Sequence, residues 1–392
     1  MDQERIQQAI RDAGFDGWLF YDFRKLNPLA YRVLGLSEEG FYTRRWFYFV
    51  PAQGEPTAII SSVEPHVLGE LPGRRRVFRS WRELTTLLEE SLQSARRLAM
   101  EYSPMNAIPT MARVDGGTLE LVRSLGKEIV SSANLVQQFV AVLSAAQVEM
   151  HREASRRLLV IKDELLNSLA RQMRAGETLT EYSVQQDFLA RIHAAGLVTE
   201  GAPIIAVNAH AGDPHYGPST AGSAPIREGD LLLLDFWGHL PQPGAIFADY
   251  TWMAFIGARV PEKYQQVFDI VRRARDHGIA FLRERVERGQ PVQGWEVDQA
   301  VRDLITAAGY GDFFVHRTGH SITTVEHGDG ANLDNLETHD ERLVLANTCC
   351  SIEPGIYLPE FGVRSEVNVL IQANSIEVTG VPIQQEIIPL LA

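Results

Sequence analysis

Apolar residues recur along the chain at spacings typical of both helices and strands. Over residues 158–169, six leucine and isoleucine side chains fall on one side of a helical pattern, which predicts a long amphipathic helix. Residues 46–50 and 57–61 are short apolar runs on either side of a Gly/Pro-rich turn, and this arrangement predicts a β-hairpin. Helical and strand patterns therefore share the chain, as expected of a mixed α and β protein.

The first part of the chain reads as a small α/β domain. Residues 6–13 predict a short helix that Gly14 closes, residues 17–21 a buried strand, and residues 97–102 another strand. Polar residues in this part form no motif with recognisable chemistry. A long helical pattern begins after the junction near residues 140–150. We therefore expect a first domain over residues 1–140 and a second over residues 147–392.

The second part contains a similarity to itself that suggests an internal duplication. Residues 176–196 and 289–309 each begin with glycine, continue with a helical pattern and close with Ala-Ala-Gly, and Val184 falls on Val297 at a constant offset. Each segment follows a long helical pattern and precedes a strand-like stretch. The duplication predicts two halves related by a pseudo-twofold axis, and a site shared between them would take ligands from both.

The charge and cysteine content of the chain limit its expected binding partners and cellular compartment. The 392 residues include 37 basic and 50 acidic side chains, giving a net charge of −13. This sign argues against nucleic acid and against anionic membranes. The two cysteines, Cys349 and Cys350, are adjacent and rarely bridge in that arrangement. The charged N-terminus does not resemble a signal peptide, and no apolar run approaches the roughly 18 residues of a membrane helix. We therefore expect a cytoplasmic protein.

Two aspartates lie in neighbouring predicted strands of the second part. An apolar strand over residues 231–234 ends in Asp235, and a second strand over residues 247–252 contains Asp249. A turn rich in Gly and Pro separates the strands, so a hairpin would place the two carboxylates side by side. Buried carboxylates repel each other and lose hydration. The pair therefore predicts a positive partner between them.

Three further ligand types follow: His320 in a glycine-containing loop, Glu353 before a Pro-Gly pair, and Glu366 in a predicted strand. Four carboxylates and one imidazole suit two divalent ions such as Mn²⁺, with Co²⁺ or Zn²⁺ as alternatives, better than a tetrahedral Cys/His site does. Two ions about 3.5–4 Å apart can polarise a carbonyl together. Each residue alone has a simpler explanation, as a turn residue, an ion-pair partner or a solvated histidine. The prediction depends on the whole set.

These residues resemble the pita-bread superfamily of prolidase, aminopeptidase P, creatinase and methionine aminopeptidase. The first 140 residues resemble the creatinase-type N-terminal domain, which methionine aminopeptidases lack. The resemblance implies an α+β fold, in which a small α/β domain precedes a pita-bread domain with the internal pseudo-twofold repeat. The matching segments are Asp235, Asp249-Tyr250-Thr251, His316-Arg317-Thr318-Gly319-His320, Ser351 to Tyr357, and Gly362 to Glu366.

The resemblance also implies a role for each residue. Asp235 would bind one metal ion, and His320 with Glu353 would complete the other. Asp249 and Glu366 would bridge the two ions, and Glu353 would also act as general base toward the bridging water. The remaining implied residues are the substrate-binding and catalytic histidines His215 and His327, which would stabilise the developing oxyanion, and Thr251 and Arg364, which would orient the carboxylates.

Some positions depart from the family pattern. Ser321-Ile322-Thr323 follows His320 where the family has Gly-x-Gly, and Gly328 replaces the usual acid after His327. A few extra residues lengthen the turn over Gly238–Gly244, which such hairpin tips tolerate. All five implied metal ligands are nevertheless present. The departures are those of a divergent, prolidase-like branch.

Three hypotheses follow for the function. The leading one is metal-dependent hydrolysis of the amide bond before proline in dipeptides or short peptides, by a homodimer as the resemblance suggests. The second is a non-peptidase enzyme on the same scaffold, either another amidase or a metal-dependent lyase. The third is a binding protein that has lost catalysis, against which the five retained ligands argue. Dipeptidase and aminopeptidase activity stay open at this point.

Overall fold

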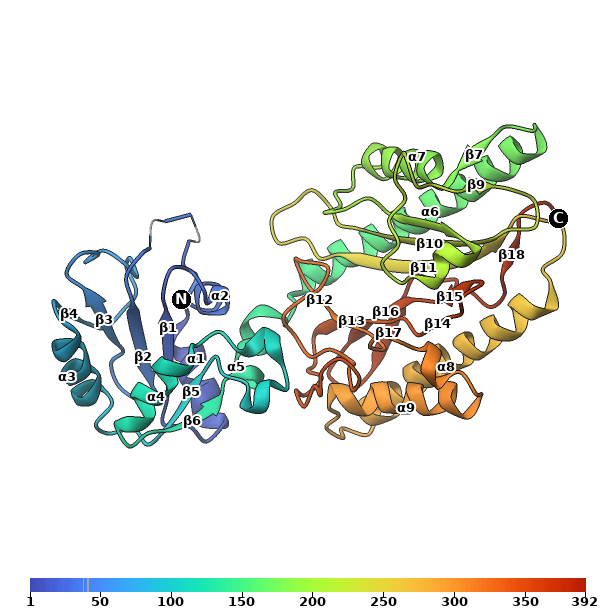
Figure 1. Cartoon of the computed structure of the whole chain (residues 1–392). Helices are drawn as coiled ribbons and strands as arrows, with labels where there is room; N and C mark the ends of the chain where they lie inside the picture. The colour runs from blue at the N-terminus through green and yellow to red at the C-terminus, as the bar shows by residue number, and fades with distance from the viewer. Residues whose placement is uncertain (38, 41) are drawn as a thin grey trace. The chain divides into compact units, whose positions relative to one another are not determined.

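The computed structural model of the chain describes residues 1–37, 39–40 and 42–392 (Figure 1). It divides into two units, Met1–Val140 and Ala141–Ala392. No helix within the described residues is long and apolar enough to cross a membrane.

A mixed six-stranded sheet, in the order β4-β3-β2-β1-β5-β6, fills the first unit. The central strand β1 is buried along its whole length because helices cover both faces of the sheet. Alternate side chains take opposite faces, so Trp18 and Phe20 pack with α1, α2 and α5, whereas Leu19 and Tyr21 pack with α3 and α4. The predicted hairpin is confirmed as the antiparallel pair β2–β3. The elements are α1 (Gln3–Asp12), β1 (Gly17–Asp22), α2 (Pro28–Leu34), β2 (Trp46–Pro51), β3 (Thr57–Ser61), β4 (Arg74–Phe78), α3 (Trp81–Ser91), β5 (Arg97–Met100), α4 (Gly116–Ser124), β6 (Glu128–Ser131) and α5 (Ala133–Val140).

The second unit consists of two halves with the same order of elements, as the duplication predicts. In each half a long helix and a 14-residue helix precede the strands of one four-stranded sheet, and β18, near the end of the chain, completes the sheet of the first half. The first half contains α6 (Ala145–Arg174), α7 (Glu181–Ala194), β8 (Ile204–Val207), β10 (Leu231–Gly238) and β11 (Ala248–Phe255). The second half contains α8 (Glu262–Glu287), α9 (Gly294–Ala307), β12 (Ser321–Ile322), β13 (Thr348–Ile352), β16 (Val367–Ile371) and β17 (Ile376–Thr379). Shorter strands are β7 (Leu179–Thr180), β9 (Pro225–Ile226), β14 (Gly355–Tyr357), β15 (Gly362–Arg364) and β18 (Ile388–Pro389).

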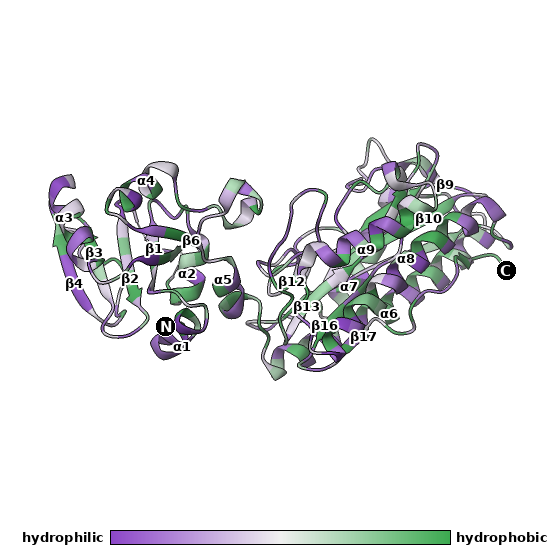
Figure 2. Ribbon diagram, turned by 90° about the horizontal axis from the view of Figure 1, so that it is seen from below, coloured by the Kyte–Doolittle hydropathy of each residue, from purple (hydrophilic) through white to green (hydrophobic). Residues whose placement is uncertain are grey.

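The alternation along β10 determines which of its side chains meet the helices. Leu232, Leu234 and Phe236 pack into the core that α6 and α7 cover. Leu231 and Leu233 point to the other face, where they pack with residues of α8. Hydrophobic and hydrophilic residues alternate along α8 and α9 (Figure 2), as expected of helices with one face on a core. By the same alternation, Asp235 and Trp237 at the end of β10 also face away from α6 and α7.

Two local predictions were wrong. Asp235 does not end its strand, because the ladder between β10 and β11 continues to the pair Gly238–Ala248. Glu366 does not lie in a strand but between β15 and β16. The chain leaves one sheet for another at this point, since β15 pairs with β14 whereas β16 pairs with β13.

Candidate metal centre

The β10–β11 hairpin brings three polar side chains to one face of its sheet. Asp235 lies directly opposite Thr251, and Asp249 lies opposite Trp237. Residues that oppose each other in an antiparallel ladder share a face, as do residues two apart on one strand. The two aspartates are therefore diagonal neighbours, as the sequence predicts.

The second half of the unit contributes the histidine and the glutamates. His320 lies just before β12, and its backbone N–H donates to Ser351 Oγ at 2.9 Å. The Ser351 hydroxyl donates in turn to Glu353 Oε1 at 3.0 Å. Gly319 permits this close approach of the two segments, because a Cβ atom there would lie 2.1 Å from the Ser351 carbonyl oxygen.

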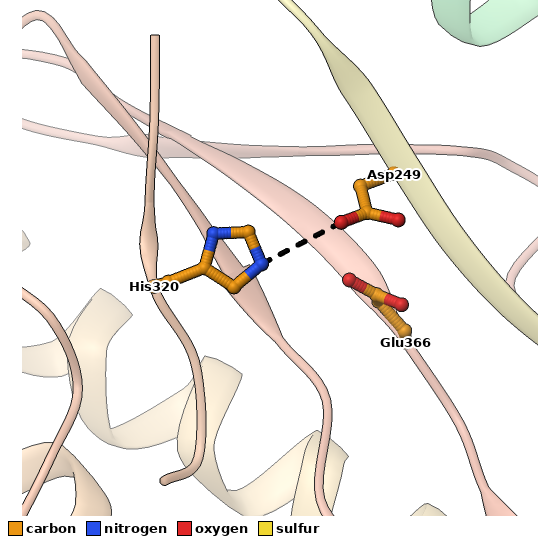
Figure 3. A group of neighbouring side chains, drawn as sticks. All are labelled: Asp249, His320 and Glu366. Carbon is orange, nitrogen blue, oxygen red and sulfur yellow. Dashed lines mark ion pairs between the residues drawn. The ribbon is translucent and has the colours of Figure 1, made fainter. Parts of the chain in front are cut away.

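Asp249, His320 and Glu366 form a compact group of buried ligand atoms. One ligand atom from each residue lies within 4.8 Å of the others, and Figure 3 shows the two carboxylates next to each other with the imidazole pointing toward them. His320 Nε2 lies 3.5 Å from Asp249 Oδ2. Asp249 Oδ1 and Glu366 Oε1 are buried without a hydrogen-bond partner. Unpaired buried carboxylate oxygens that face each other fit a bound cation, which would satisfy both.

The remaining predicted site residues line the same cavity of about 370 Å³, with the exception of Thr251, which is buried beneath it. His215 and His327 are both exposed at its surface. The rings of His320 and His327 meet edge to face, with centroids 4.4 Å apart. The structure therefore brings the predicted ligands and both substrate-side histidines together. The cavity is lined by Ile204, Pro214, His215, Asp235, Trp237, Asp249, His316, Arg317, His320, Glu326, His327, Glu337, Glu353, Arg364 and Glu366.

Burial and mutual repulsion perturb the acids of this cavity. Burial, with added repulsion from Glu366, raises the pKa of Asp249 well above its usual range. Burial likewise raises the pKa of Glu366, and that of Glu353 to about 7. Burial lowers the pKa of His320 well below its usual value. A cation bound at this group would offset the repulsion, because it favours ionised carboxylates and a neutral imidazole.

Arg364 and Thr251 both form hydrogen bonds with carboxylates, and the partner of Arg364 is not the acid nearest to it in sequence. The guanidinium donates to Asp235 Oδ2 at 2.5 Å and to Thr251 Oγ1 at 2.9 Å. The Thr251 hydroxyl donates to Glu366 Oε2 at 2.8 Å. The threonine thus links Arg364 to Glu366, and these contacts leave the other Glu366 oxygen free for a cation.

Sequence reasoning missed two residues that hold the site in place. Asn368 brackets Asp249, since its side chain accepts from the Asp249 backbone N–H at 2.9 Å and donates to the Asp249 carbonyl at 2.7 Å. Glu181, buried at the start of α7, accepts from Ala224 N–H at 2.7 Å and Tyr216 O–H at 2.6 Å. Glu181 thereby fastens the segment that carries His215. Both contacts join residues far apart in sequence, and no local pattern indicates them.

Residues 149–373, more than half of the chain, match the model of metallopeptidase family M24. The chain belongs to this family. Over 197 residues it is 29% identical to the Xaa-Pro dipeptidase of Lactobacillus helveticus, covering 50% of this chain and 48% of the relative. It is 28% identical over 251 residues to the uncharacterized peptidase YqhT of Bacillus subtilis, covering 63% of this chain and 64% of the relative. These alignments thus span about half to two thirds of the relatives' length.

The fold of this M24 protein agrees with solved structures of the same kind. The crystal structure of dipeptidase PepE from Mycobacterium ulcerans covers 99% of this chain, and 97% of its own chain is matched, with a TM-score of 0.68 at 24% identity. At this identity the likeness establishes the fold, which is the α+β pita-bread arrangement that the sequence predicts. Membership of this metallopeptidase family implies divalent metal, and the buried group of Asp249, His320 and Glu366 is a candidate to hold it.

Proposed function

We propose that this M24 protein is a dinuclear metal-dependent peptidase that hydrolyses the amide bond before proline in dipeptides or short peptides. The observation that carries the proposal is the pair of buried, unpaired oxygens on Asp249 and Glu366. Two facing carboxylates with free oxygens are suited to bridging two cations. The similarity to the Xaa-Pro dipeptidase of Lactobacillus helveticus supports the choice of substrate.

Each ligand has a place in this proposal. Asp249 and Glu366 would be shared by the two ions, Asp235 would bind one, and His320 with Glu353 would bind the other. Two divalent ions bound there would act as Lewis acids toward the scissile carbonyl and lower the pKa of a water molecule. The oxygen-rich ligand set favours Mn²⁺, with Co²⁺ or Zn²⁺ as alternatives.

Other groups of the cavity transfer the proton and bind the substrate. Glu353 acts as the general base, because it lies beside His320 and one of its oxygens is oriented by the Ser351 hydroxyl. His215 and His327 hold the substrate and stabilise the developing oxyanion, since both line the cavity. Thr251 and Arg364 orient the carboxylates of Asp235 and Glu366 through hydrogen bonds.

The rest of the molecule completes the proposal. The unit Met1–Val140 serves as a creatinase-type N-terminal domain, ahead of a catalytic domain in the unit Ala141–Ala392, which begins six residues before the predicted start at residue 147. The two thiols, Cys349 and Cys350, are unpaired and buried, which supports a reducing, cytoplasmic compartment. From the family resemblance we also propose that two copies of this chain form a homodimer.

Cleavage of a small peptide panel, followed by mass spectrometry, tests the function. The panel holds Xaa-Pro dipeptides, Xaa-Pro-Yaa peptides and matched Xaa-Ala controls, each with added Mn²⁺ or with EDTA. We expect Mn²⁺-dependent release of the residue before proline and loss of this activity in Glu353→Gln. Glu360→Gln is the matched control, because Glu360 is an exposed acid outside the cavity. A protein that binds metal but cleaves none of the peptides would move the assignment to a non-peptidase amidase or lyase.

A further inference from the structure

Arg275 on α8 is a fully buried arginine of the second unit. Burial lowers the pKa of Arg275, and its acidic partner Asp276 on the same helix opposes this shift. Moving a guanidinium group out of water is costly unless good hydrogen bonds compensate for the lost hydration. An apolar side chain of similar volume would fill the same space without that cost. The role of the buried charge therefore lies in the hydrogen bonds that it makes.

One nitrogen of Arg275 joins two distant segments of the chain. Nη1 donates to Ser365 Oγ at 2.6 Å and to the Gln384 carbonyl oxygen at 2.9 Å, and both acceptors belong to buried residues. Nε and Nη2 both donate to Asp276 Oδ1, at 3.0 and 2.8 Å, which fixes the plane of the guanidinium group. Arg275 therefore holds Ser365 and Gln384 next to each other.

Ser365 belongs to the segment that carries Glu366. It lies between Arg364 and Glu366, which both line the cavity. Ser365 and Glu366 are located between β15 and β16, outside the ladders of both strands. A backbone segment without a ladder needs other hydrogen bonds to fix its position. The hydrogen bond from Arg275 supplies such an anchor directly beside Glu366.

Gln384 connects Arg275 to the strand that carries Asp249. The side-chain amide of Gln384 accepts from the Met253 backbone N–H at 2.9 Å and donates to the Met253 carbonyl oxygen at 2.6 Å. Met253 lies on β11, four residues after Asp249. Arg275 is therefore the hydrogen-bonded link between the two backbone segments that carry the facing carboxylates of Asp249 and Glu366.

We propose that Arg275 is a positioning residue of the metal centre, which sets the separation of the Asp249 and Glu366 carboxylates. It acts through its hydrogen bonds to Ser365 and Gln384, because it is not among the described residues that line the cavity. The free oxygens of the two carboxylates must converge on the same ions, and metal affinity is sensitive to the groups that orient the ligands. The proposal rests on the proposed function only in that both carboxylates bind metal.

Calorimetric titration of the metal-free full chain with Mn²⁺ tests the proposal. Arg275→Met removes the donors but fills the space, and Ser365→Ala removes only the acceptor hydroxyl. We expect each substitution to weaken Mn²⁺ binding about tenfold, at the lower end of the range for groups that support metal ligands. Because the two side chains share one hydrogen bond, the double variant should lose little more than Arg275→Met alone. Arg275→Lys should recover part of the loss, since it keeps one charged donor.

Lys162→Met is the matched control, because Lys162 is another buried cation of the same unit. Lys162 is 3% exposed, pairs with Asp163, lies over the Trp252 ring and is not among the described residues of the cavity lining. Its loss should change the Mn²⁺ affinity by less than about twofold, although it also removes a buried charge. Electron paramagnetic resonance gives a second readout. Loss of the carboxylate bridges in Arg275→Met would replace the spectrum of two spin-coupled Mn²⁺ ions by that of isolated ions.

Two outcomes would overturn the proposal. An unchanged Mn²⁺ affinity in Arg275→Met would show that the arginine does not position the carboxylates. An equal loss of affinity in Arg275→Met and Lys162→Met would mean that both act only through the general stability of the unit.

Two complications leave the test decisive. If Arg275→Met does not fold, Ser365→Ala decides alone, since an affinity equal to wild type would overturn the proposal and a tenfold loss would support it. If the wild type binds Mn²⁺ but cleaves no peptide, the proposed function fails, whereas the affinities of the variants still decide the role of Arg275.

Discussion

A buried histidine that forms a hydrogen bond with the β10–β11 hairpin makes the stability of the protein depend on pH. His151 on α6 is fully buried, with Nδ1 2.6 Å from the Phe247 carbonyl oxygen and Nε2 2.8 Å from Thr379 Oγ1. A carbonyl only accepts, so Nδ1 carries the proton, and Nε2 accepts from the threonine in the neutral ring. Tyr250 and Ser155 extend this chain of hydrogen bonds. The neutral ring thus satisfies both of its nitrogens without carrying a charge into the buried interior.

The size of the effect follows from the shift in pKa. Burial lowers the pKa of His151 from 6.5 to about 4. Between these values the unfolded chain binds a proton that the folded chain does not, so stability is complete above pH 6.5 and is lost as pH falls toward 4. At about 1.4 kcal/mol per pKa unit, the full loss is about 3.5 kcal/mol, of which about 3 kcal/mol is reached at pH 4.

Urea unfolding of the metal-free protein between pH 4 and pH 7 measures this loss. The free energy of unfolding of the wild type should fall by about 3 kcal/mol more than that of His151→Gln over this range. His277→Gln, at an exposed histidine on α8, should follow the wild type. Parallel pH dependence in the wild type and His151→Gln would refute the reasoning, because the buried ring would then not be the titrating group.

Three further predictions follow from contacts around the site. Thr251→Val removes the hydroxyl that links Arg364 to Glu366. The Mn²⁺ affinity measured by calorimetry should then fall about 10–100-fold, and an unchanged affinity would show that Thr251 does not orient the carboxylate. Glu181→Gln should lower the free energy of unfolding in urea by about 1–3 kcal/mol, because buried donors lose an acceptor oxygen. A variant as stable as the wild type would argue against this structural role of Glu181. Burial raises the pKa of Cys350 to about 12, so iodoacetamide should alkylate it only on unfolding, and rapid alkylation of native protein would disprove this.

Local patterns were sufficient to predict much of the fold. The periodicities over residues 158–169 and the Gly/Pro turn before residue 57 correspond to α6 and to the β2–β3 hairpin. The Ala-Ala-Gly repeat corresponds to the ends of α7 and α9. These signals are local, because helix caps, turns and alternation involve residues close together in sequence.

The parts that could not be predicted depend on long-range geometry. The partner of Arg364 could not be read from its neighbours, since Asp235 lies 129 residues away and Glu366 only two. The bracket formed by Asn368 spans 119 residues. The β10 ladder also continues through Asp235, although a polar residue at the end of an apolar run suggests a strand end. Such contacts are determined by the packing of two sheets and leave no periodic trace in the sequence.

The central claim is that Asp249 and Glu366 bridge two metal ions, and anomalous diffraction from a manganese-soaked crystal tests it most directly. The account predicts two anomalous peaks about 3.5–4 Å apart, with Asp249 and Glu366 contacting both, Asp235 contacting one, and His320 with Glu353 contacting the other. A single peak, or two peaks that share neither carboxylate, would contradict it.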